Sequence, residues 1–230
     1  MIPTLLIPGL ACTPELFAAQ IPTLWAHGPV AVASTLEGET MADLAAAILS
    51  GAPPRFALAG LSMGGYIALE IVRQAPDRLS RLALLDTSAR PDTPEQSEVR
   101  RGLISRTQAG GFEAVLVETA PRLLHPGHQS DPMLLATQVR MGLAVGTEAY
   151  VRQQTAIIGR IDFRPHLSGI AIPTMVLVGD RDALTPPDRA IEMTCAIPGA
   201  RLEIIAGAGH LTPLEQPDAV GRLLTEWLFE

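Results

Sequence analysis

The stretch that decides the fold is Arg55-Phe-Ala-Leu-Ala-Gly-Leu-Ser-Met-Gly-Gly-Tyr66. Its apolar run Phe56 to Ala59 is typical of a buried strand, and apolar residues after Tyr66 recur at helical spacing. Between them, Gly60-Leu-Ser-Met-Gly64 matches G-x-S-x-G, a sharp strand-to-helix turn that holds its serine in a strained, exposed conformation. A turn with a chance pair of glycines is the alternative. Because the required strand and helix are both present, we predict that Ser62 is a nucleophile.

Composition and charge restrict the class of protein. The chain has 230 residues, of which 47% are hydrophobic, enough for one domain with a sizeable core. The net charge of −7 argues against a nucleic-acid partner. All 17 basic residues are Arg, which excludes Schiff-base catalysis by a lysine and any Ser-Lys pair. No apolar run is long enough to span a bilayer and no basic segment precedes the first one, so we expect a cytoplasmic protein without a membrane partner.

The two cysteines, Cys12 and Cys195, lie far apart and form no C-x-x-C or Cys/His cluster. We expect reduced thiols, no metal and no organic cofactor. Cys12 follows a glycine loop, so a nucleophilic thiol there is an alternative. Ser62 occupies the better-defined nucleophile position.

Short apolar strands alternate with helices at both ends of the chain. The expected strands are Thr4–Ile7, Val30–Ala33, Phe56–Ala59, Leu82–Leu85, Thr174–Val178 and Leu202–Ile205. The expected helices are Leu16–Leu24, one capped by Thr40 and running to Leu49, one after Ser62, one from about Pro186, and Gln216–Phe229. This alternation predicts an α/β fold with an about six-stranded, mostly parallel sheet flanked by helices.

A helical insertion interrupts this alternation after the fourth strand. Its expected helices are Pro94–Gln108, Phe112–Leu124, Pro132–Val145 and Thr147–Ile158. The segment from 90 to 167 holds nine Arg and eight acidic residues, so it is less acidic than the rest of the chain. This balance indicates tolerance of acidic substrates, with an ordinary solvated helical face as the alternative. We therefore divide the chain into a core (1–88), a helical cap insertion (89–167) and the remainder of the core (168–230).

Three residues with complementary chemistry follow strands in the order Ser62, Asp182, His210. In open α/β sheets, functional groups gather at the carboxyl ends of strands. A serine becomes an effective nucleophile when an imidazole accepts its proton, and the imidazole needs a carboxylate to fix its tautomer and stabilise its charge. The three residues therefore form a candidate catalytic triad.

These motifs resemble the α/β-hydrolase superfamily over nearly the whole chain. The markers are GLSMGG at the turn, GDRDALTPP after the fifth expected strand and GAGHLTPLEQP near the end. The chain looks most like the enol-lactonase and pimeloyl-carrier-protein methyl ester esterase branches. The resemblance implies that Asp182, and not Asp180, is the acid and that His210 is the histidine. Asp86, at the end of the fourth strand, is the rival acid, because some relatives place theirs there.

The resemblance also implies an oxyanion hole made by the backbone N–H groups of Leu10 and Met63. The chain departs from the family in having Pro8-Gly9 where relatives have His-Gly, which removes a side chain that often braces this loop. A second difference is that members of the family usually have two strands before the one expected here at Thr4–Ile7. The remaining histidines, His27, His125, His128 and His166, are expected to be surface groups, with His125 and His128 as alternative pocket residues.

The predicted activity is hydrolysis of carboxylic esters of small to medium acyl groups through an acyl-enzyme. The predicted partner is a small-molecule ester, and the chain is expected to be a monomer or homodimer. A thioesterase or C–C bond hydrolase would use the same triad, and a slow-turnover ligand receptor of this fold is an alternative from another class. A proline iminopeptidase is disfavoured because such relatives usually carry Trp where Met63 stands, and a dehalogenase would require Asp at position 62.

Overall fold

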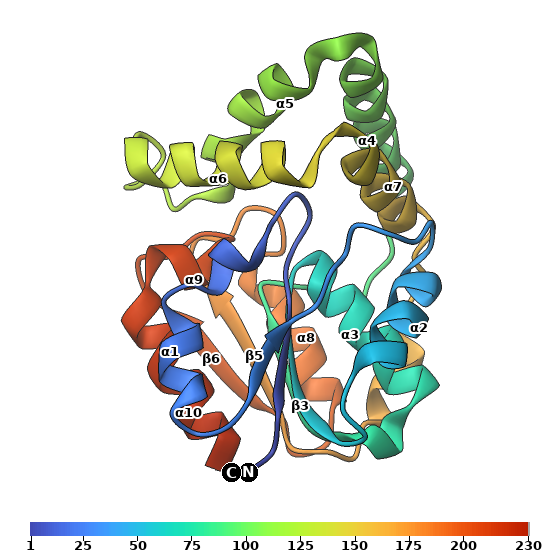
Figure 1. Ribbon diagram of the computed structural model, residues 1–230, viewed down its shortest axis with the longest axis vertical. Helices are drawn as coiled ribbons and strands as arrows, with labels where there is room; N and C mark the ends of the chain where they lie inside the picture. Colours follow the sequence, from blue (N-terminus) through green and yellow to red (C-terminus); the bar gives the residue numbers. More distant parts are fainter. Residues whose placement is uncertain (230) are drawn as a thin grey trace.

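The computed structural model describes residues 1–229, so Glu230, the last residue of the predicted third segment, lies outside it. A six-stranded sheet with all neighbouring strands parallel forms its centre (Figure 1). The strands are β1 Thr4–Ile7, β2 Val30–Val32, β3 Phe56–Leu61, β4 Leu79–Leu85, β5 Thr174–Gly179 and β6 Arg201–Ile205. The predicted α/β fold is confirmed.

The strand order is β2-β1-β3-β4-β5-β6. The chain therefore adds strands on one side of β1 and then on the other, so β1 and β3 flank a point where the order reverses. Ligands of open α/β sheets bind at such points, outside the carboxyl ends of the strands. The sharp turn after β3 and the glycine loop after β1 both lie at this position.

Helices cover both faces of the sheet (Figure 1). One face carries η1 Pro14–Phe17, α1 Gln20–Trp25, α9 Thr212–Glu215 and α10 Pro217–Phe229, and the other carries α2 Met41–Gly51, α3 Met63–Gln74 and α8 Pro187–Ala196. Short 3₁₀ turns at η2 Pro76–Arg78 and η5 Arg164–Gly169 precede β4 and β5. The second expected helix, α2, is capped as predicted, since the Thr40 hydroxyl accepts the N–H of Asp43.

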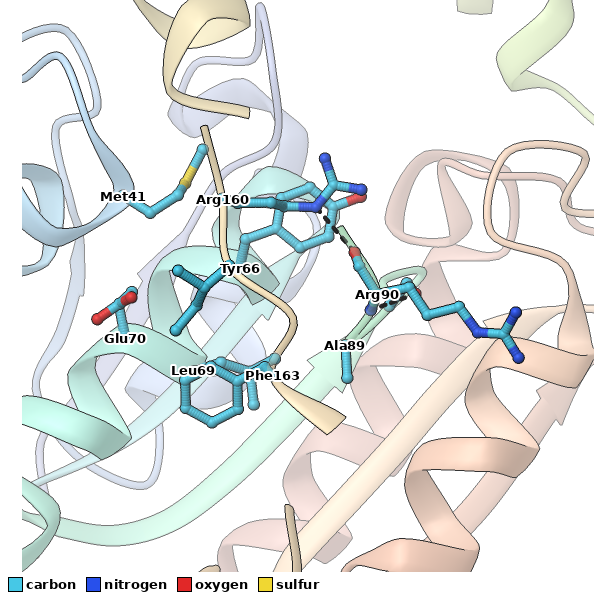
Figure 2. Close-up of a pocket in the computed structure, with 10 residues that line it drawn as sticks. Met41, Tyr66, Leu69, Glu70, Ala89, Arg90, Arg160 and Phe163 are labelled. Atoms are coloured by element: carbon cyan, nitrogen blue, oxygen red, sulfur yellow. Dashed lines mark hydrogen bonds between the residues drawn. The ribbon is translucent and has the colours of Figure 1, made fainter. Parts of the chain in front are cut away.

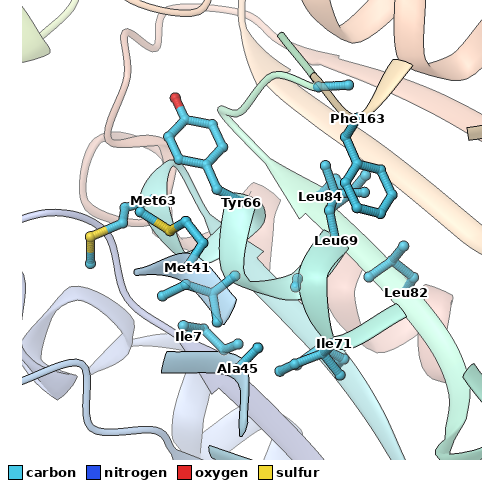
Figure 3. Packing of buried hydrophobic residues seen from close by; sticks show 14 of the residues in the cluster. Ile7, Met41, Ala45, Met63, Tyr66, Leu69, Ile71, Leu82, Leu84 and Phe163 are labelled. Atoms are coloured by element: carbon cyan, nitrogen blue, oxygen red, sulfur yellow. The ribbon is translucent and has the colours of Figure 1, made fainter. Parts of the chain in front are cut away.

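The apolar strands are buried on both faces because successive side chains point in opposite directions. In β5, Val176 and Val178 pack into the cluster beneath α2, α3 and α8, whereas Met175 and Leu177 pack toward α1 and α10. Figure 3 shows part of the first cluster, in which α2 and α3 meet the sheet. In the second cluster Trp227 is fully buried, and its indole N–H donates to the carbonyl of Leu82 at 3.0 Å.

The segment between β4 and β5 contains helices and no strand within the described residues. Its elements are α4 Pro94–Arg106, the π-helical η3 Thr107–Gly111, α5 Phe112–Thr119, η4 Ala120–Leu123, α6 Pro132–Val145 and α7 Thr147–Ile158. These helices lie across the end of the sheet that carries the site described below (Figure 1). None of the helices in residues 1–229 combines the length and apolarity needed to cross a membrane.

Two local differences from the expected elements have physical reasons. The expected helix Leu16–Leu24 is two pieces, η1 and α1. Pro22 has no N–H and its ring would clash with the carbonyl four residues earlier, so a continuous helix through it is disfavoured. The second expected helix of the insertion ends at Thr119 and continues as η4, whose second residue is Pro121. The short helix α9 was not expected.

Candidate active site

Ser62 occupies a strained turn between β3 and α3. Its φ of 55° and ψ of −114° lie where L residues are rare. Hydrogen bonds on both sides hold the strain, since Ser62 N–H donates to the Leu85 carbonyl at 2.9 Å and the Thr87 hydroxyl donates to the Ser62 carbonyl at 2.8 Å. The hydroxyl of Ser62 therefore projects from the carboxyl end of the sheet, as the motif predicts.

Two glycines make this turn sterically possible. A Cβ on Gly60 would lie 2.2 Å from the Gly64 carbonyl oxygen, and one on Gly64 would lie 2.1 Å from the Ile7 carbonyl oxygen. Both contacts involve backbone atoms that cannot swing aside. The packing of α3 against β3 and β1 therefore requires the two glycines of the G-x-S-x-G pattern.

The structure brings the three predicted side chains of the triad together. His210 Nε2 lies 2.8 Å from Ser62 Oγ, and its Nδ1 lies 2.8 Å from Asp182 Oδ2. His210 and Asp182 are buried, at 4% and 3% exposure. Hydrogen bonds at these distances orient one imidazole between the hydroxyl and the carboxylate.

Asp182 is fixed by the loop between β5 and α8. Its Oδ1 accepts the N–H groups of Leu184 and Thr185 at 2.8 and 3.0 Å. The Thr185 hydroxyl donates to Oδ2 at 2.7 Å and lies 3.3 Å from His210 Nδ1. Asp182 thus accepts four hydrogen bonds when His210 Nδ1 carries a proton.

His210 follows β6 in a loop packed closely against the Asp182 loop. A Cβ on Gly179 would lie 2.0 Å from the Gly209 carbonyl oxygen, so only glycine permits this approach. The His210 N–H donates to the Leu123 carbonyl at 2.8 Å, and the Gly209 N–H donates to Glu215 Oε1 at 2.7 Å. Backbone bonds therefore determine where the imidazole lies.

The paired groups shift each other's pKa. Burial alone would lower the pKa of His210, but the charge of Asp182 and its hydrogen bond outweigh burial and raise it above the ordinary 6.5. Burial alone would raise the pKa of Asp182, but the charge of His210 and the hydrogen bonds from His210 and Thr185 lower it. Both shifts favour the ionised pair that forms when His210 accepts a proton.

The rival acid Asp86 lies nearby without touching His210. It is fully buried, its Oδ1 accepts the Gly179 N–H at 2.9 Å and its Oδ2 accepts the Thr212 hydroxyl at 2.5 Å. Burial first, and then the charge of Asp182, raise the pKa of Asp86 well above 3.8, which favours its neutral form. Asp180, the acid that the resemblance set aside, accepts the Ala208 N–H at 3.2 Å.

The loop after β1 faces Ser62. Among residues 1–229, no acceptor is hydrogen-bonded to the N–H of Leu10 or of Met63, the two predicted oxyanion donors. The next N–H, that of Ala11, donates to Gln153 Oε1 of α7 at 3.0 Å, and Ala11 has a φ of 55°. Gln153 is 1% exposed and its Nε2 donates to the carbonyl and hydroxyl of Thr35. The buried side chain of Gln153, in the insertion, thus holds the loop after β1. This is the loop in which the chain has Pro8 at the position where the resemblance implies a histidine.

A cavity of about 550 Å³ opens over Ser62 and His210. Its walls come from the β1 loop, the β5 loop and the insertion, with apolar side chains at Leu103, Leu116, Leu123, Met141 and Ile157. Beside it, Arg160 lies over the ring of Tyr66, 4.3 Å from the ring centroid, and donates to the Arg90 carbonyl (Figure 2). The volume of the cavity over Ser62 and His210 falls in the range of small-molecule sites.

Cys12 also lines the cavity, but burial raises the pKa of its thiol to about 12. Its thiol is therefore a poor nucleophile at neutral pH. Within the described residues, no group of three or more His, Cys, Asp or Glu side chains is arranged to hold a metal ion.

Supporting residues of the site differ in how far the sequence pointed to them. Thr185 and Glu215 lie within the motifs GDRDALTPP and GAGHLTPLEQP, although the motifs did not show their contacts. Gln153 carried no signal, because its partner Ala11 stands 142 residues away. His128, expected to be a surface group, is about a third exposed and its Nδ1 lies 2.9 Å from the buried Glu215. His166 is exposed, and His27 and His125 are partly exposed.

Comparison with known proteins identifies the family. Residues 5–223 match the alpha/beta hydrolase family, and the chain belongs to this family. A relative from Klebsiella pneumoniae, "Putative carbamate hydrolase RutD", is 30% identical over 201 residues, which are 85% of this chain and 72% of the relative. Proteins named pimeloyl-[acyl-carrier protein] methyl ester esterase also match.

Solved structures share the fold over nearly all of this chain and most of their own length. A thermophilic esterase from Thermogutta terrifontis, with malate bound, is 33% identical with a TM-score of 0.90, and the match covers 99% of this chain and 89% of that one. The enol-lactonase from Burkholderia xenovorans is 25% identical with a TM-score of 0.88, covering 100% and 92%. The predicted resemblance is confirmed, and the chain is a hydrolase of this family.

Proposed function

We propose that this chain is a serine hydrolase that cleaves carboxylic esters of small to medium acyl groups through an acyl-enzyme. The observation that carries the proposal is the continuous hydrogen-bond relay from Ser62 through His210 to Asp182, which opens onto the cavity. A buried imidazole held between a strained serine hydroxyl and a carboxylate is the arrangement that activates serine for attack on a carbonyl.

In the proposed first step, Ser62 Oγ attacks the carbonyl carbon while His210 Nε2 accepts the hydroxyl proton. The tetrahedral intermediate collapses, and the leaving alcohol takes the proton back from His210. Water then attacks the acyl-enzyme in the same way, with His210 again accepting and returning a proton. One ester and one water give one acid and one alcohol, and Ser62 is regenerated.

We propose the backbone N–H groups of Leu10 and Met63 as the oxyanion hole. Neither donates within residues 1–229, and Leu10 lines the same cavity as Ser62. Met63 directly follows Ser62 and begins α3, whose N-terminus favours negative charge there. The insertion, predicted at 89–167, would serve as a cap that supplies the apolar walls of the cavity. Those walls suit an acyl chain of modest length.

Other carbonyl substrates would use the same residues. Thioester and C–C bond hydrolysis differ in the leaving group, and the name of the Klebsiella relative adds carbamates to these alternatives. A ligand receptor with slow turnover is the alternative from another class, and the intact relay speaks against a receptor that has lost catalysis.

The test is hydrolysis of p-nitrophenyl esters of increasing acyl length, followed from the first turnover. We expect a burst of nitrophenol close to the enzyme concentration, because nitrophenol is a good leaving group and acylation should therefore be faster than hydrolysis of the acyl-enzyme. The acyl length with the highest kcat/KM shows how long an acyl chain the cavity accommodates. Turnover no faster than the background of the inactivated protein on esters, thioesters and carbamates alike would favour the receptor.

The pH dependence of kcat/KM follows from the pKa of His210. The imidazole must be neutral to accept the Ser62 proton, so activity falls as pH drops through its pKa. Because Asp182 raises that pKa above 6.5, we expect the midpoint of the acid limb above pH 6.5 in the wild type. In Asp182→Asn the burial remains without the charge, so the residual activity should show a midpoint at lower pH. If the midpoint is the same in Asp182→Asn and wild type, the group whose ionisation limits activity is not His210 paired with Asp182.

Gln153→Met tests whether the insertion positions the oxyanion loop. The variant removes the acceptor of the Ala11 N–H and both donations to Thr35, so the Leu10 N–H is no longer held in place. We expect kcat to fall about 10- to 100-fold with a small change in KM, because the loop acts on the transition state. Thr155→Ala, an exposed position on α7, is the control. An unchanged kcat in folded Gln153→Met would contradict this role.

A further inference from the structure

Gln138 of α6 has a buried amide oxygen without a hydrogen-bond partner. The residue is 7% exposed and lines the cavity over Ser62 and His210. Its Oε1 accepts no hydrogen bond from the described part of the chain. An acceptor that is removed from water without a partner lowers the stability of the fold, and native structures contain few of them. One that lies in the wall of an active-site cavity is a candidate contact for a ligand.

Gln138 lies in the part of the cavity wall that α6 supplies, on the side of the loop that carries His210. Leu134 and Met141, four residues before and three residues after it, share its face of the helix. Met141 belongs to the apolar cluster that also contains Leu211, the residue after His210, and Leu134 packs against that cluster. The amide is therefore surrounded mainly by apolar side chains, where a hydrogen bond is stronger than in water.

The adjacent helix α5 supplies a second acceptor to the cavity. Its polar side chain in the wall is that of Thr119, whose hydroxyl donates to the Val115 carbonyl at 2.8 Å. With its hydrogen engaged there, the Thr119 hydroxyl offers a ligand only the lone pairs of its oxygen. Two neighbouring acceptors select a ligand that donates.

The Gln138 amide is free to turn toward such a ligand. The last torsion of a glutamine side chain is broad and has no deep staggered wells. The Nε2 group donates to the Leu134 carbonyl at 3.4 Å, which is longer than the roughly 2.7–3.2 Å usual for an N–H···O bond. A small rotation about this torsion therefore costs little and moves Oε1 relative to the cavity.

The charges of the cavity wall restrict the donor to an uncharged group. The carboxylates of the wall are Asp92 and Glu95, and its arginines are Arg90, Arg100, Arg122, Arg160 and Arg189. An excess of positive charge disfavours an ammonium group in the cavity. A hydroxyl or an amide-type N–H donates without bringing a further positive charge.

We propose that the Gln138 amide oxygen accepts a hydrogen bond from the substrate, so that the preferred substrates carry a hydroxyl or an uncharged N–H group in the part that lies under α6. The inference rests on the proposed function and adds a class of substrate to it. A site that hydrogen-bonds a substrate donor rejects the analogue without that donor, because the buried group is then left unpaired.

The test compares pairs of esters in which a terminal hydroxyl replaces a methyl group. In one arm the alcohol carries the donor, as ω-hydroxyalkyl butyrates against alkyl butyrates. In the other arm the acyl chain carries it, as p-nitrophenyl ω-hydroxyalkanoates against p-nitrophenyl alkanoates. Chain length increases by one carbon at a time in both arms. We expect wild type to favour the hydroxyl in kcat/KM by about tenfold in at least one arm, which also shows on which part of the substrate the donor lies.

Gln138→Met keeps the length of the side chain and removes the amide. We expect its kcat/KM ratio, hydroxyl over methyl, to fall to one or below. Because the ratio compares two substrates on one protein, a general loss of stability cancels. A wild-type ratio of one or below in both arms, or a preference for the hydroxyl that survives in Gln138→Met, would overturn the inference.

Gln129→Met is the matched control. Gln129 also donates to a backbone carbonyl at 3.4 Å, that of Leu124, but it is exposed and lies outside the cavity wall. The substitution is the same, so the kcat/KM ratio should equal that of wild type. A Gln129→Met protein that lost the preference for the hydroxyl would contradict the assignment to Gln138.

Thermal unfolding separates a ligand contact from a structural one. Replacing an unpaired buried amide by an apolar side chain of similar shape should leave stability unchanged or raise it. We therefore expect Gln138→Met to unfold at or above the temperature of wild type. A lower unfolding temperature with an unchanged kcat/KM ratio would show that Gln138 is structural.

Binding to the Ser62→Ala protein tests the contact without turnover. We expect calorimetry to show about tenfold weaker binding of the hydroxyl esters when Gln138→Met is added, and little change for their methyl counterparts. If wild type hydrolyses no ester but binding of the hydroxyl esters depends on Gln138, the proposed reaction fails and the contact stands. If esters are hydrolysed but neither the rates nor the binding depend on Gln138, the reaction stands and the contact fails.

Discussion

Replacing Ser62 by Ala is expected to lower kcat for p-nitrophenyl ester hydrolysis by about a million-fold. The hydroxyl oxygen that lies 2.8 Å from His210 Nε2 is lost, and with it the covalent intermediate. The residual rate would come from the oxyanion donors and from binding alone. The measurement is steady-state hydrolysis with protein purified apart from other esterases, together with the loss of the nitrophenol burst.

Ser88→Ala serves as a matched control for Ser62→Ala. Ser88 also lines the cavity, and its hydroxyl accepts the Arg90 N–H at 3.1 Å without touching His210. We expect a small change in rate. A Ser62→Ala protein that retained its burst, or more than about one hundredth of the rate, would show that Ser62 is not the nucleophile.

Asp182→Asn is expected to lower kcat about ten-thousand-fold, because an amide facing Nδ1 favours the wrong tautomer of His210 and cannot stabilise its charge. Asp86→Asn should cost far less. Asp86 makes no hydrogen bond to His210, and its raised pKa favours a neutral group, which Asn resembles in charge. The two variants change the same chemical group in neighbouring loops, so each controls for the other.

The measurement for this pair is kcat on one ester, with thermal unfolding of both variants. A large loss in Asp86→Asn with a small loss in Asp182→Asn would reverse the assignment and make Asp86 the acid. Comparable large losses, with both proteins folded, would mean that the two carboxyl groups act as one unit, which their proximity permits.

Local pattern was sufficient to predict the sheet. The strands β1, β3 and β5 are short, mostly apolar runs that are buried throughout, as expected for a parallel sheet covered on both faces, so their positions were unambiguous. Helices α6 and α7 begin and end where expected, because Asp131-Pro132 and Gly146 are strong boundary signals. The division of the expected helix Leu16–Leu24 into η1 and α1 was missed, because the apolar pattern favoured one helix and only Pro22 argued against it.

The candidate triad was predictable because each member sits in a motif of its own: glycines around Ser62, GDRD before α8 and GAGH after β6. The supporting contacts were not. Gln153 reaches Ala11 from a helix whose position over the sheet depends on the packing of the whole insertion.

Glu215 connects the insertion to the loop that carries His210. Its buried carboxylate accepts the N–H groups of Gly209 and His125 and faces the ring of His128, while His210 N–H is bonded to Leu123. Residues 123–128 are therefore held by hydrogen bonds to the loop that carries His210. We therefore expect any displacement of residues 123–128 to move the His210 loop as well, so that a change in this part of the insertion alters the alignment of the imidazole.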